Sequence, residues 1–237
     1  TEEHQRALSS YTLLPELVRF TKTDWTRQEV ESKTGVGSTV VSPSVNTDLF
    51  RPRPRLDPEW PDRPTRIAAM IRPCAPYREP RLTMELLRQA AERYHMDVEA
   101  ILFGTSLDDP GFAALPRNFP WKLAGVLSQK QVARLMNEVD IFVDFSSHQA
   151  MGLTAMEAMA CGVAVIVPQE GGTDSFARHE ENCLVVNTAS EEACWRALRR
   201  LIDDDSLRQR LQRNAARDIC HHYPERPAFN ILSALFD

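Results

Sequence analysis

The sequence predicts an α/β protein in which a Rossmann-like parallel sheet is covered by helices on both faces. Short apolar runs rich in β-branched residues alternate with longer stretches in which apolar residues recur at helical spacing. The run at 163–167 is apolar throughout, which is typical of a strand buried between two layers of helices. A helical stretch leads into this run through Cys161 and Gly162, as in half of a βαβ unit.

The expected elements follow from local signals taken in chain order. Residues 1–42 contain a helical stretch, strands near 18–22 and 38–42, and a helix near 25–33. In the main domain, apolar residues on one face predict a helix over 82–94. The remaining elements expected there are strands at 66–71, 98–103, 121–126, 141–145, 163–167 and 183–187, and helices at 129–137, 153–160, 174–177, 191–202 and 206–220.

The chain is expected to divide into four segments. Residues 1–42 precede a Pro-rich connector at 43–64, because proline denies the backbone donors that regular elements need. The main α/β domain covers 65–217, and ligands of such sheets bind at the carboxyl ends of the strands. The tail, 218–237, contains an apolar helix at 229–236.

Composition limits the class of protein. The chain has 237 residues, of which 43% are hydrophobic and 26% charged, as in a soluble globular protein. A net charge of −5 argues against a nucleic-acid-binding surface. Five cysteines at wide spacing, without a CxxC pair, indicate buried free thiols in a reducing compartment. No apolar run is long enough to suggest a membrane span.

The stretch from His148 to Gly172, HQAMGLTAMEAMACGVAVIVPQEGG, combines a loop, a helix, a buried strand and a Gly-Gly turn. The first turn of a helix has unpaired N–H groups that attract anions, Gly152 permits close approach of a phosphate, and Thr154 adds a hydroxyl. Glu157 lies roughly 7–8 Å further along the axis, where it can accept hydrogen bonds from a ribose. A helix that merely packs tightly, with a solvated Glu, explains the composition equally well.

These residues resemble the retaining family-4 glycosyltransferases of the GT-B fold, whose signature is E-x-F-G-x-x-x-x-E-A-M-A-x-G-x-P-V. The run from Glu157 to Val165 matches the second half, while Gln149 occupies the first Glu position and Met151 the Phe position. The segments VVSPSVNTDLFRP and GVLSQKQVARLMNEVDIFVDFSS also resemble stretches of that family. The resemblance implies that 1–42 is the end of a GT-B N-terminal domain and that 65–217 is the C-terminal, donor-binding domain. Because the chain begins at Thr1 and lacks most of the first domain, we expect a fragment of a larger polypeptide.

The resemblance also implies roles for individual residues. Glu157 would bind the donor ribose, and Gln149 would lie beside the donor sugar. The backbone after Gln149 would contact the sugar and phosphates; it comprises Ala150, Met151, Gly152, Leu153 and Thr154. Gln149 cannot carry the negative charge of the usual Glu, although its amide can still orient hydroxyls.

Arginines after the first main strand are candidates for neutralising a diphosphate. Arg72 aligns with the Arg of the family pattern G-R-x-x-x-x-K-G, and Arg78 stands one residue from its Lys position. Arginine offers a rigid fork of donors and stays charged, so no metal or other cofactor is expected. Lesser candidates for donor binding are Gly104, where a nucleotide could approach a strand end, Val126 and Leu127 near the base, and the amides of Gly171 and Gly172.

The sequence therefore predicts part of a metal-independent glycosyltransferase that transfers a hexose or deoxyhexose from a nucleotide-diphospho-sugar with retention, in bacterial surface polysaccharide synthesis. Its expected partners are that donor and a glycan or lipid-linked acceptor held by the missing N-terminal domain. We expect a cytoplasmic protein, with peripheral association of the full-length protein at the inner face of the membrane. A degenerate, non-catalytic scaffold domain, motivated by Gln149, and a sugar-nucleotide epimerase of the same fold remain alternatives.

Overall fold

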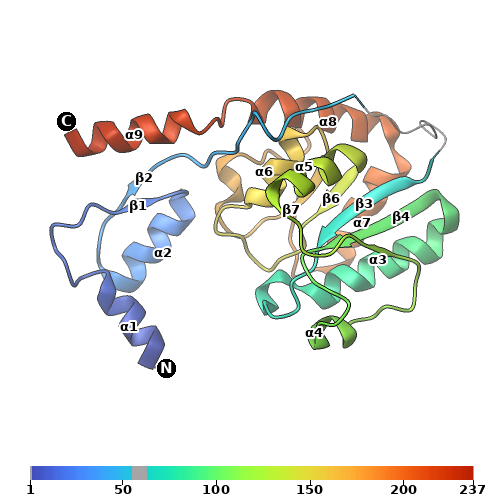
Figure 1. Ribbon diagram of the computed structural model, residues 1–237, viewed down its shortest axis with the longest axis horizontal. Coiled ribbons are helices and arrows are strands. Elements are labelled where there is room, and N and C mark those ends of the chain that lie inside the picture. Colours follow the sequence, from blue (N-terminus) through green and yellow to red (C-terminus); the bar gives the residue numbers. More distant parts are fainter. Residues whose placement is uncertain (1, 55–62, 237) are drawn as a thin grey trace.

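The computed structural model describes residues 2–54 and 63–236, and its centre is a six-stranded parallel sheet. The strands lie in the order β5-β4-β3-β6-β7-β8 (Figure 1). They comprise β3 (Thr65–Met70), β4 (Val98–Phe103), β5 (Lys122–Leu123), β6 (Ile141–Val143), β7 (Ala164–Pro168) and β8 (Leu184–Val186). The predicted fold class, a Rossmann-like parallel sheet with helices on both faces, is confirmed.

Two hydrophobic layers cover the two faces of the sheet. On one face, α5 (Gln129–Glu138) and α6 (Leu153–Ala160) pack on Ala68, Phe142 and Val165. On the other face, α3 (Pro80–Tyr94) and α7 (Glu191–Asp203) pack on the alternate side chains of the same strands. This alternation is what the two-residue period of a strand requires when both faces are buried.

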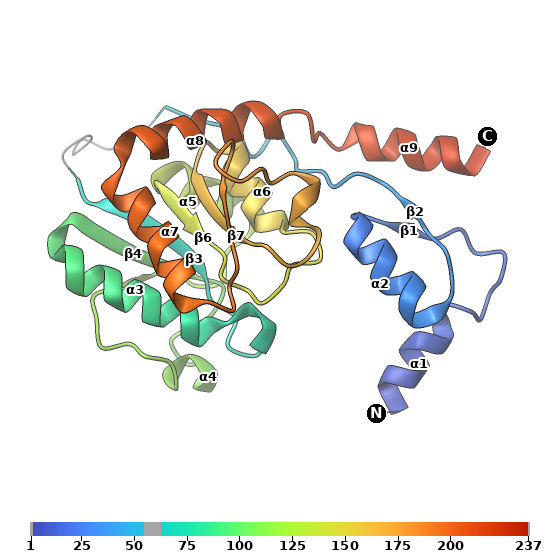
Figure 2. The same cartoon turned by 180° about the vertical axis from the view of Figure 1, so that it is seen from behind.

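The helix α8 (Asp205–Ile219) connects the two layers. Leu207 and Leu211, in its first half, belong to the layer of α3 and α7. Ala215 and Ile219, in its second half, belong to the layer of α5 and α6. Beyond it, α9 (Glu225–Phe236) extends away from the α/β body on the same side as the N-terminal segment (Figure 2).

The helix starts have local causes in the sequence. The Asp204 side chain accepts from the Leu207 N–H at the start of α8, and Ser128 and Gln131 form a capping box at the start of α5. These contacts satisfy N–H groups that the first turn of a helix leaves without partners. Short elements complete the fold: the 3₁₀ turns η1 (Pro76–Arg78), η2 (His95–Asp97) and η3 (Gly172–Ser175), and α4 (Pro110–Ala113).

The N-terminal segment is a small unit beside the sheet domain (Figure 1). It holds α1 (Glu2–Ser10), β1 (Phe20–Thr21), α2 (Asp24–Thr34) and β2 (Thr39–Val40), and β1 pairs with β2 in parallel. The described part of the Pro-rich connector forms no helix or strand, yet Val45 and Phe50 are buried in the core layer of α6. The connector is therefore anchored to the domain between 43 and 54, and its remaining residues 55–62 lie outside the described part.

The elements differ from the expected ones in several places. The strand expected over 121–126 covers only Lys122–Leu123, and in place of the helix expected over 174–177 there is the 3₁₀ turn Gly172–Ser175. The strand expected over 141–145 ends at Val143, and α9 begins at Glu225 rather than near 229. The sequence analysis also missed α4, although its Asp109 cap accepts from the N–H groups of Gly111 and Phe112. Asp followed by Pro is a helix-start signal, because proline suits the first helical position. Within the described residues, no helix is long and apolar enough to cross a membrane.

Candidate functional site

The carboxyl ends of β3 and β6 form the topological switch point of the sheet. The strand order runs outward from β3 through β4 in one direction and from β6 through β7 in the other. Ligands of open parallel sheets bind in the crevice outside such a point. The loops that follow these two strands, 71–79 and 144–152, carry six of the fourteen predicted site residues.

The loops after β3, β4 and β5 meet at one end of this edge. The Gly104 N–H donates to the Gly125 carbonyl at 2.8 Å. Gly104 has φ +94°, and a Cβ placed there would lie 3.5 Å from Arg72 Nε. Arg72 is exposed, and its guanidinium makes no ion pair or hydrogen bond with the described residues. The structure therefore brings Arg72 and Gly104 together, close to the exposed Val126, while Leu127 packs against the core.

A buried carboxylate lies beneath the loop that contains Gln149. Asp144, the first residue after β6, accepts from Gln149 Nε2 at 2.6 Å through Oδ2 and from the Ser146 N–H at 3.1 Å through Oδ1. The Ser146 hydroxyl also donates to Oδ1 and accepts from Gln149 Nε2 at 3.0 Å. Arg78 Nη1 lies 3.8 Å from Asp144 Oδ2. Arg78, Asp144 and Thr154 line the same small cavity. The Arg78 side chain is therefore held by an ion pair within the protein, whereas the Arg72 guanidinium has no such contact with the described residues.

The Gly-Gly turn after β7 is fixed against the Gln149 loop. The Gly172 N–H donates to the Gln149 carbonyl at 2.8 Å, and the Gln149 N–H donates to the Glu170 carbonyl at 3.2 Å. A Cβ at Gly171 would lie 2.1 Å from the Gln149 carbonyl oxygen, and its φ is +114°. Both glycines are therefore required by close packing, and the Gly172 amide is already used within the protein.

The helix α6 carries Glu157 into a desolvated position. Gly152 precedes the helix with φ +83°, and a Cβ there would press on Phe176 and Thr173 at 3.2 Å. Glu157 is 7% exposed, and its carboxylate makes no hydrogen bond or ion pair with the described residues. Because burial penalises the charged form, the pKa of Glu157 is raised to about 7. Leu153, in the first turn, is exposed.

The N-terminal segment completes the surroundings of the Gln149 loop. The Thr23 and Thr26 hydroxyls donate to the Ala150 carbonyl at 2.9 and 3.2 Å. Ala150 and Met151 line a cavity of about 360 Å³ whose other residues come from that segment. These two residues therefore face the N-terminal segment, which the local sequence did not indicate.

Aromatic rings surround His148 at the same edge. Its ring lies 5.8 Å from that of Trp25 and 5.2 Å from that of Tyr77, measured between centroids. Its Nδ1 is 3.1 Å from the Ser147 hydroxyl, and Trp25 Nε1 donates to Glu170 at 3.1 Å. The loops after β3, β6 and β7 are thus joined to α2 by polar and ring contacts.

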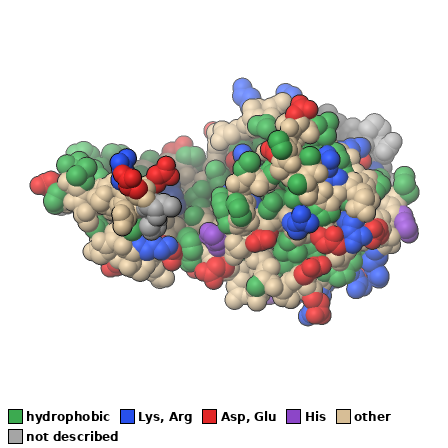
Figure 3. Space-filling view, turned by 90° about the horizontal axis from the view of Figure 1, so that it is seen from below, with side chains coloured by type: hydrophobic (Ala, Val, Ile, Leu, Met, Phe, Trp, Pro, Cys, Tyr) green, Lys and Arg blue, Asp and Glu red, His purple; other side chains and the backbone are tan. Residues whose placement is uncertain are grey.

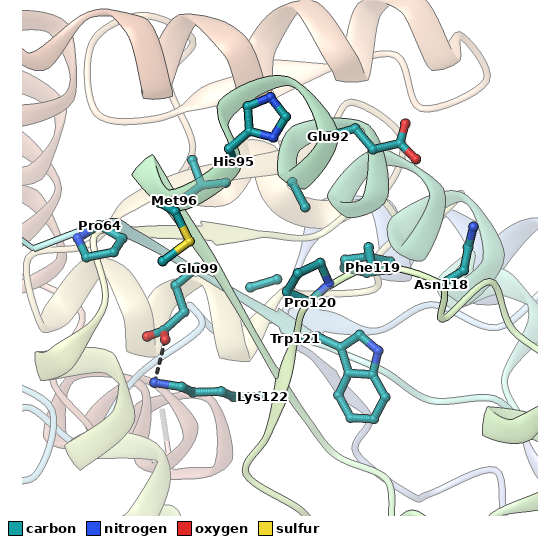
Figure 4. A pocket seen from close by; sticks show the side chains of 13 residues that line it. Pro64, Glu92, His95, Met96, Glu99, Asn118, Phe119, Pro120, Trp121 and Lys122 are labelled. Carbon is teal, nitrogen blue, oxygen red and sulfur yellow. Dashed lines mark ion pairs between the residues drawn. The ribbon is translucent and has the colours of Figure 1, made fainter.

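Two further cavities differ in where they lie. One, of about 470 Å³, is at the carboxyl edge and is lined by residues that include Ser147, Glu170 and Thr188. The other, of about 530 Å³, lies at the opposite edge near the start of β4; its lining includes Trp121, Phe119, Met96 and the Glu99–Lys122 ion pair (Figure 4). The second cavity is remote from the switch point.

The described residues give no sign of a metal centre, and one face of the surface carries charges of both signs. No group of three His, Cys, Asp or Glu side chains among residues 2–54 and 63–236 is placed to hold a metal ion. On the face drawn in Figure 3, basic and acidic side chains are interspersed. Of the five cysteines, Cys74 and Cys220 are exposed and the other three are buried, so the expectation of uniformly buried thiols was wrong for two of them.

Sequence reasoning missed Asp144 and Ser146. A strand expected through Phe145 left no reason to look for chemistry at these positions. The signal was present: an acidic residue stands in a run that is otherwise apolar from Ile141 to Phe145. A carboxylate in such a run has to be paired or hydrogen-bonded, because leaving it buried alone is costly.

Residues 121–218 match the family of glycosyl transferases group 1. The lipopolysaccharide core biosynthesis glycosyltransferase LpsE of Rhizobium meliloti is 38% identical over 73 residues, which are 31% of this chain and 22% of that protein. The D-inositol 3-phosphate glycosyltransferase of Nocardioides sp. is 30% identical over 197 residues, covering 74% of this chain and 43% of that protein. The chain therefore spans less than half the length of these curated relatives.

Solved structures show the same architecture. Sucrose-phosphate synthase from Thermosynechococcus elongatus superposes with a TM-score of 0.80 at 18% identity, covering 98% of this chain and 61% of that one. Anabaena HepE, solved in complex with UDP and glucose, gives a TM-score of 0.80 at 17% identity, covering 99% and 68%. At such identities the likeness concerns the fold. The α/β domain of the chain therefore shares the GT-B fold of these solved structures, and residues 121–218 match the group 1 glycosyl transferase model.

Proposed function

We propose that this chain is the donor-binding part of a retaining glycosyltransferase that uses a nucleotide-diphospho-sugar carrying a hexose or deoxyhexose. The donor would bind at the switch point between β3 and β6. The proposal covers the role of 65–217 as the C-terminal domain of the enzyme, with 1–42 as the end of its N-terminal domain. The relatives named for lipopolysaccharide core synthesis favour bacterial surface polysaccharide as the product.

The observation that carries the proposal is the unpaired, buried carboxylate of Glu157. Burying a carboxylate without a partner costs free energy, and that cost is visible in its raised pKa. Ribose hydroxyls that donate to this carboxylate would replace the water it has lost. A carboxyl group whose pKa is strongly raised is a candidate functional-site residue.

Arg72 supplies the charge that the diphosphate needs. Arg72 is exposed at the strand edge, and its Nε lies 3.5 Å from the place that a Cβ would take at Gly104. A charged, bidentate donor stabilises the nucleotide diphosphate as it departs, without a metal ion. Arg78 has a second role, because its ion pair with Asp144 ties the loop after β3 to the loop after β6.

The remaining partners belong to the whole protein. A glycan or lipid-linked acceptor would be held largely by the part of the enzyme that precedes this domain. We place the full-length protein in the cytoplasm, with peripheral contact at the inner membrane face where a lipid-linked acceptor would be reached. Anabaena HepE, which shares the fold, is described in complex with UDP-glucose, and this supports a uridine nucleotide as the first donor to test.

Calorimetric titration with UDP, GDP and dTDP tests the donor site directly. We expect one of the three to bind the wild-type protein, and we expect Glu157→Ala and Arg72→Ala to weaken that binding at least tenfold. Arg81→Ala is the matched control, since Arg81 is an exposed arginine on α3. Absence of binding by all three nucleotides, or binding that both variants leave intact, would refute the proposal.

A non-catalytic binding domain is the second candidate, and the neutral Gln149 is the observation that favours it. A scaffold of that kind would bind the nucleotide but would not turn over the sugar nucleotide when the full-length polypeptide is supplied with acceptor. If the full-length protein transfers the sugar to an acceptor, and the rate of transfer is lower in the Gln149→Ala variant, the result would favour the enzyme over the binding domain.

A further inference from the structure

The amide of Gln149 is held in one orientation by the groups behind it. Both acceptors that face Nε2, Asp144 Oδ2 at 2.6 Å and Ser146 Oγ at 3.0 Å, exclude the opposite amide orientation. A carboxylate has no proton to give, and the Ser146 hydroxyl proton is donated to Asp144 Oδ1. The two N–H bonds of the amide therefore point inward, and Oε1 is the only atom of the side chain left to meet a ligand.

A negative charge directly behind an amide changes what its oxygen can do. Asp144 draws positive charge toward the N–H side of the Gln149 amide and so increases the negative charge on Oε1. Hydrogen bonds in series polarise one another in this way, most strongly where water is excluded. Asp144 and Gln149 are 8% and 5% exposed, so little solvent screens the effect.

We propose that Asp144 is the positioning residue of the donor site: its carboxylate fixes and polarises the Gln149 amide so that Oε1 accepts a hydroxyl of the donor sugar. A Glu at position 149 would itself carry a negative charge; in this chain the charge lies on Asp144, directly behind the Gln149 amide. Arg78, 3.8 Å from Asp144 Oδ2, compensates part of that charge. The proposal rests on the donor-binding function proposed above and names the group that recognises the sugar.

The arrangement has a consequence for the reverse substitution. A Glu at position 149 would place a second carboxylate where Nε2 now lies 2.6 Å from Asp144 Oδ2. Like charges at that distance repel, so one group must move or take up a proton. Gln149→Glu, which restores the family signature, is therefore expected to impair sugar recognition in this chain. Adding Asp144→Asn removes the repulsion and supplies an amide donor, so the double variant is expected to regain it.

The test compares sugar nucleotides with the corresponding nucleoside diphosphates. UDP-glucose, GDP-mannose and dTDP-rhamnose are titrated beside UDP, GDP and dTDP. The Kd of each nucleoside diphosphate divided by the Kd of its sugar nucleotide isolates the contribution of the sugar. Wild-type protein is expected to bind one sugar nucleotide more tightly than its diphosphate. Asp144→Asn and Gln149→Glu are each expected to reduce that ratio toward one, by up to about tenfold, which corresponds to about 1.4 kcal/mol. Affinity for the diphosphate itself should fall no more than about twofold.

Controls separate recognition from folding. Asp97→Asn makes the same change at an exposed aspartate on η2, at the opposite edge of the sheet, and should leave the ratio as in wild type. Thermal melting checks each variant; if Asp144→Asn does not fold, the comparison of Gln149→Glu with the double variant decides. A Gln149→Glu protein that binds the sugar nucleotide at least as well as wild type overturns the inference, as does an unchanged ratio in Asp144→Asn. Wild-type protein that binds no nucleotide refutes the proposed function, and the inference with it.

Discussion

The raised pKa of Glu157 makes both stability and ligand binding depend on pH. The folded protein holds a proton on this group up to about pH 7, whereas the ordinary value is 4.5. At about 1.4 kcal/mol per pH unit, the difference corresponds to about 3 kcal/mol of unfolding free energy. Between pH 4.5 and 7 the folded state binds more protons than the unfolded state, so stability falls as pH rises through this window and is constant above it.

Glu157→Gln isolates this contribution. The variant keeps the size of the side chain and removes the charge, so it should match wild type near pH 4. At pH 8 it should be more stable by up to about 3 kcal/mol. Burial lowers the pKa of His222, which makes stability rise with pH, so the wild-type profile contains two opposing trends. The difference between variant and wild type removes the contribution of His222.

Urea denaturation at several pH values between 4 and 8 measures the effect. Glu138→Gln, at an exposed position at the end of α5, is the matched control and should follow wild type. A difference between Glu157→Gln and wild type that stays constant with pH would refute the reasoning, since it would mean that the carboxylate is solvated. So would a Glu157→Gln protein that is less stable than wild type at pH 8.

Nucleotide binding should lower the raised pKa of Glu157, because it would give the carboxylate hydrogen bonds that burial has taken away. Hydroxyls that donate to a carboxylate favour its charged form, so nucleotide binding at pH 6 should release up to one proton. Calorimetric titration of the protein with the nucleoside diphosphate, repeated in buffers of different ionisation enthalpy, measures the number of protons released on binding. The affinity should rise up to about tenfold per pH unit between pH 5 and 7 in wild type, and this dependence should be lost in Glu157→Gln. Binding without proton release would place the ribose away from Glu157.

Three other variants test separate parts of the structure. Arg72→Ala should weaken UDP, GDP or dTDP binding at least about tenfold but leave the unphosphorylated nucleoside unchanged, because a charge-assisted contact is worth about 1.5–3 kcal/mol; equal losses in calorimetry would contradict a phosphate contact. Gly171→Ala should cost more than about 2 kcal/mol in urea denaturation, since its Cβ would lie 2.1 Å from a carbonyl oxygen, whereas Gly37→Ala, with open space around it, should not. Asp140→Ala should cost about 3–5 kcal/mol, because it removes a buried carboxylate that pairs with Arg63 at 2.7 Å and accepts from the Arg66 N–H at 2.9 Å; a loss under 1 kcal/mol would contradict this reasoning.

Local signals were sufficient for most of the fold. The α6 helix and the β7 strand were predicted within a residue because their apolar pattern and the Gly162 stop belong to the same short stretch. The helix expected over 82–94 begins two residues earlier, at Pro80, and it was recognised because the buried face of α3 repeats at helical spacing. Strands and helices alternate along the chain, and a helix that connects two parallel strands of one sheet makes a right-handed crossover. These two constraints leave few topologies, and a parallel sheet is the one they favour.

The structure brings some of the candidate residues together, but the contacts among them could not be predicted from the sequence. Arg72 and Gly104 were named from separate loops, and the sheet register brings them together. Gly172 was predicted to offer its amide to a sugar, but that amide bonds to Gln149, and a Cβ there would meet Thr23 at 2.4 Å. Gly172 is separated by 23 residues from Gln149 and by 149 residues from Thr23. Contacts over such separations leave no local pattern in the sequence, so the packing of the Gly-Gly turn and the role of the N-terminal segment could not be inferred.

The two buried carboxylates of this edge differ in what offsets their desolvation. Asp144 accepts hydrogen bonds from Gln149 and Ser146 and lies beside Arg78, so the protein itself stabilises its charge. Glu157 has no such partner among the described residues, and its pKa rises accordingly. A group satisfied within the protein orients its neighbours, whereas an unsatisfied one gains most from a ligand that donates to it. On this physical ground we propose that Glu157 binds the ribose and that Asp144 orients Gln149, the side chain proposed to meet the sugar.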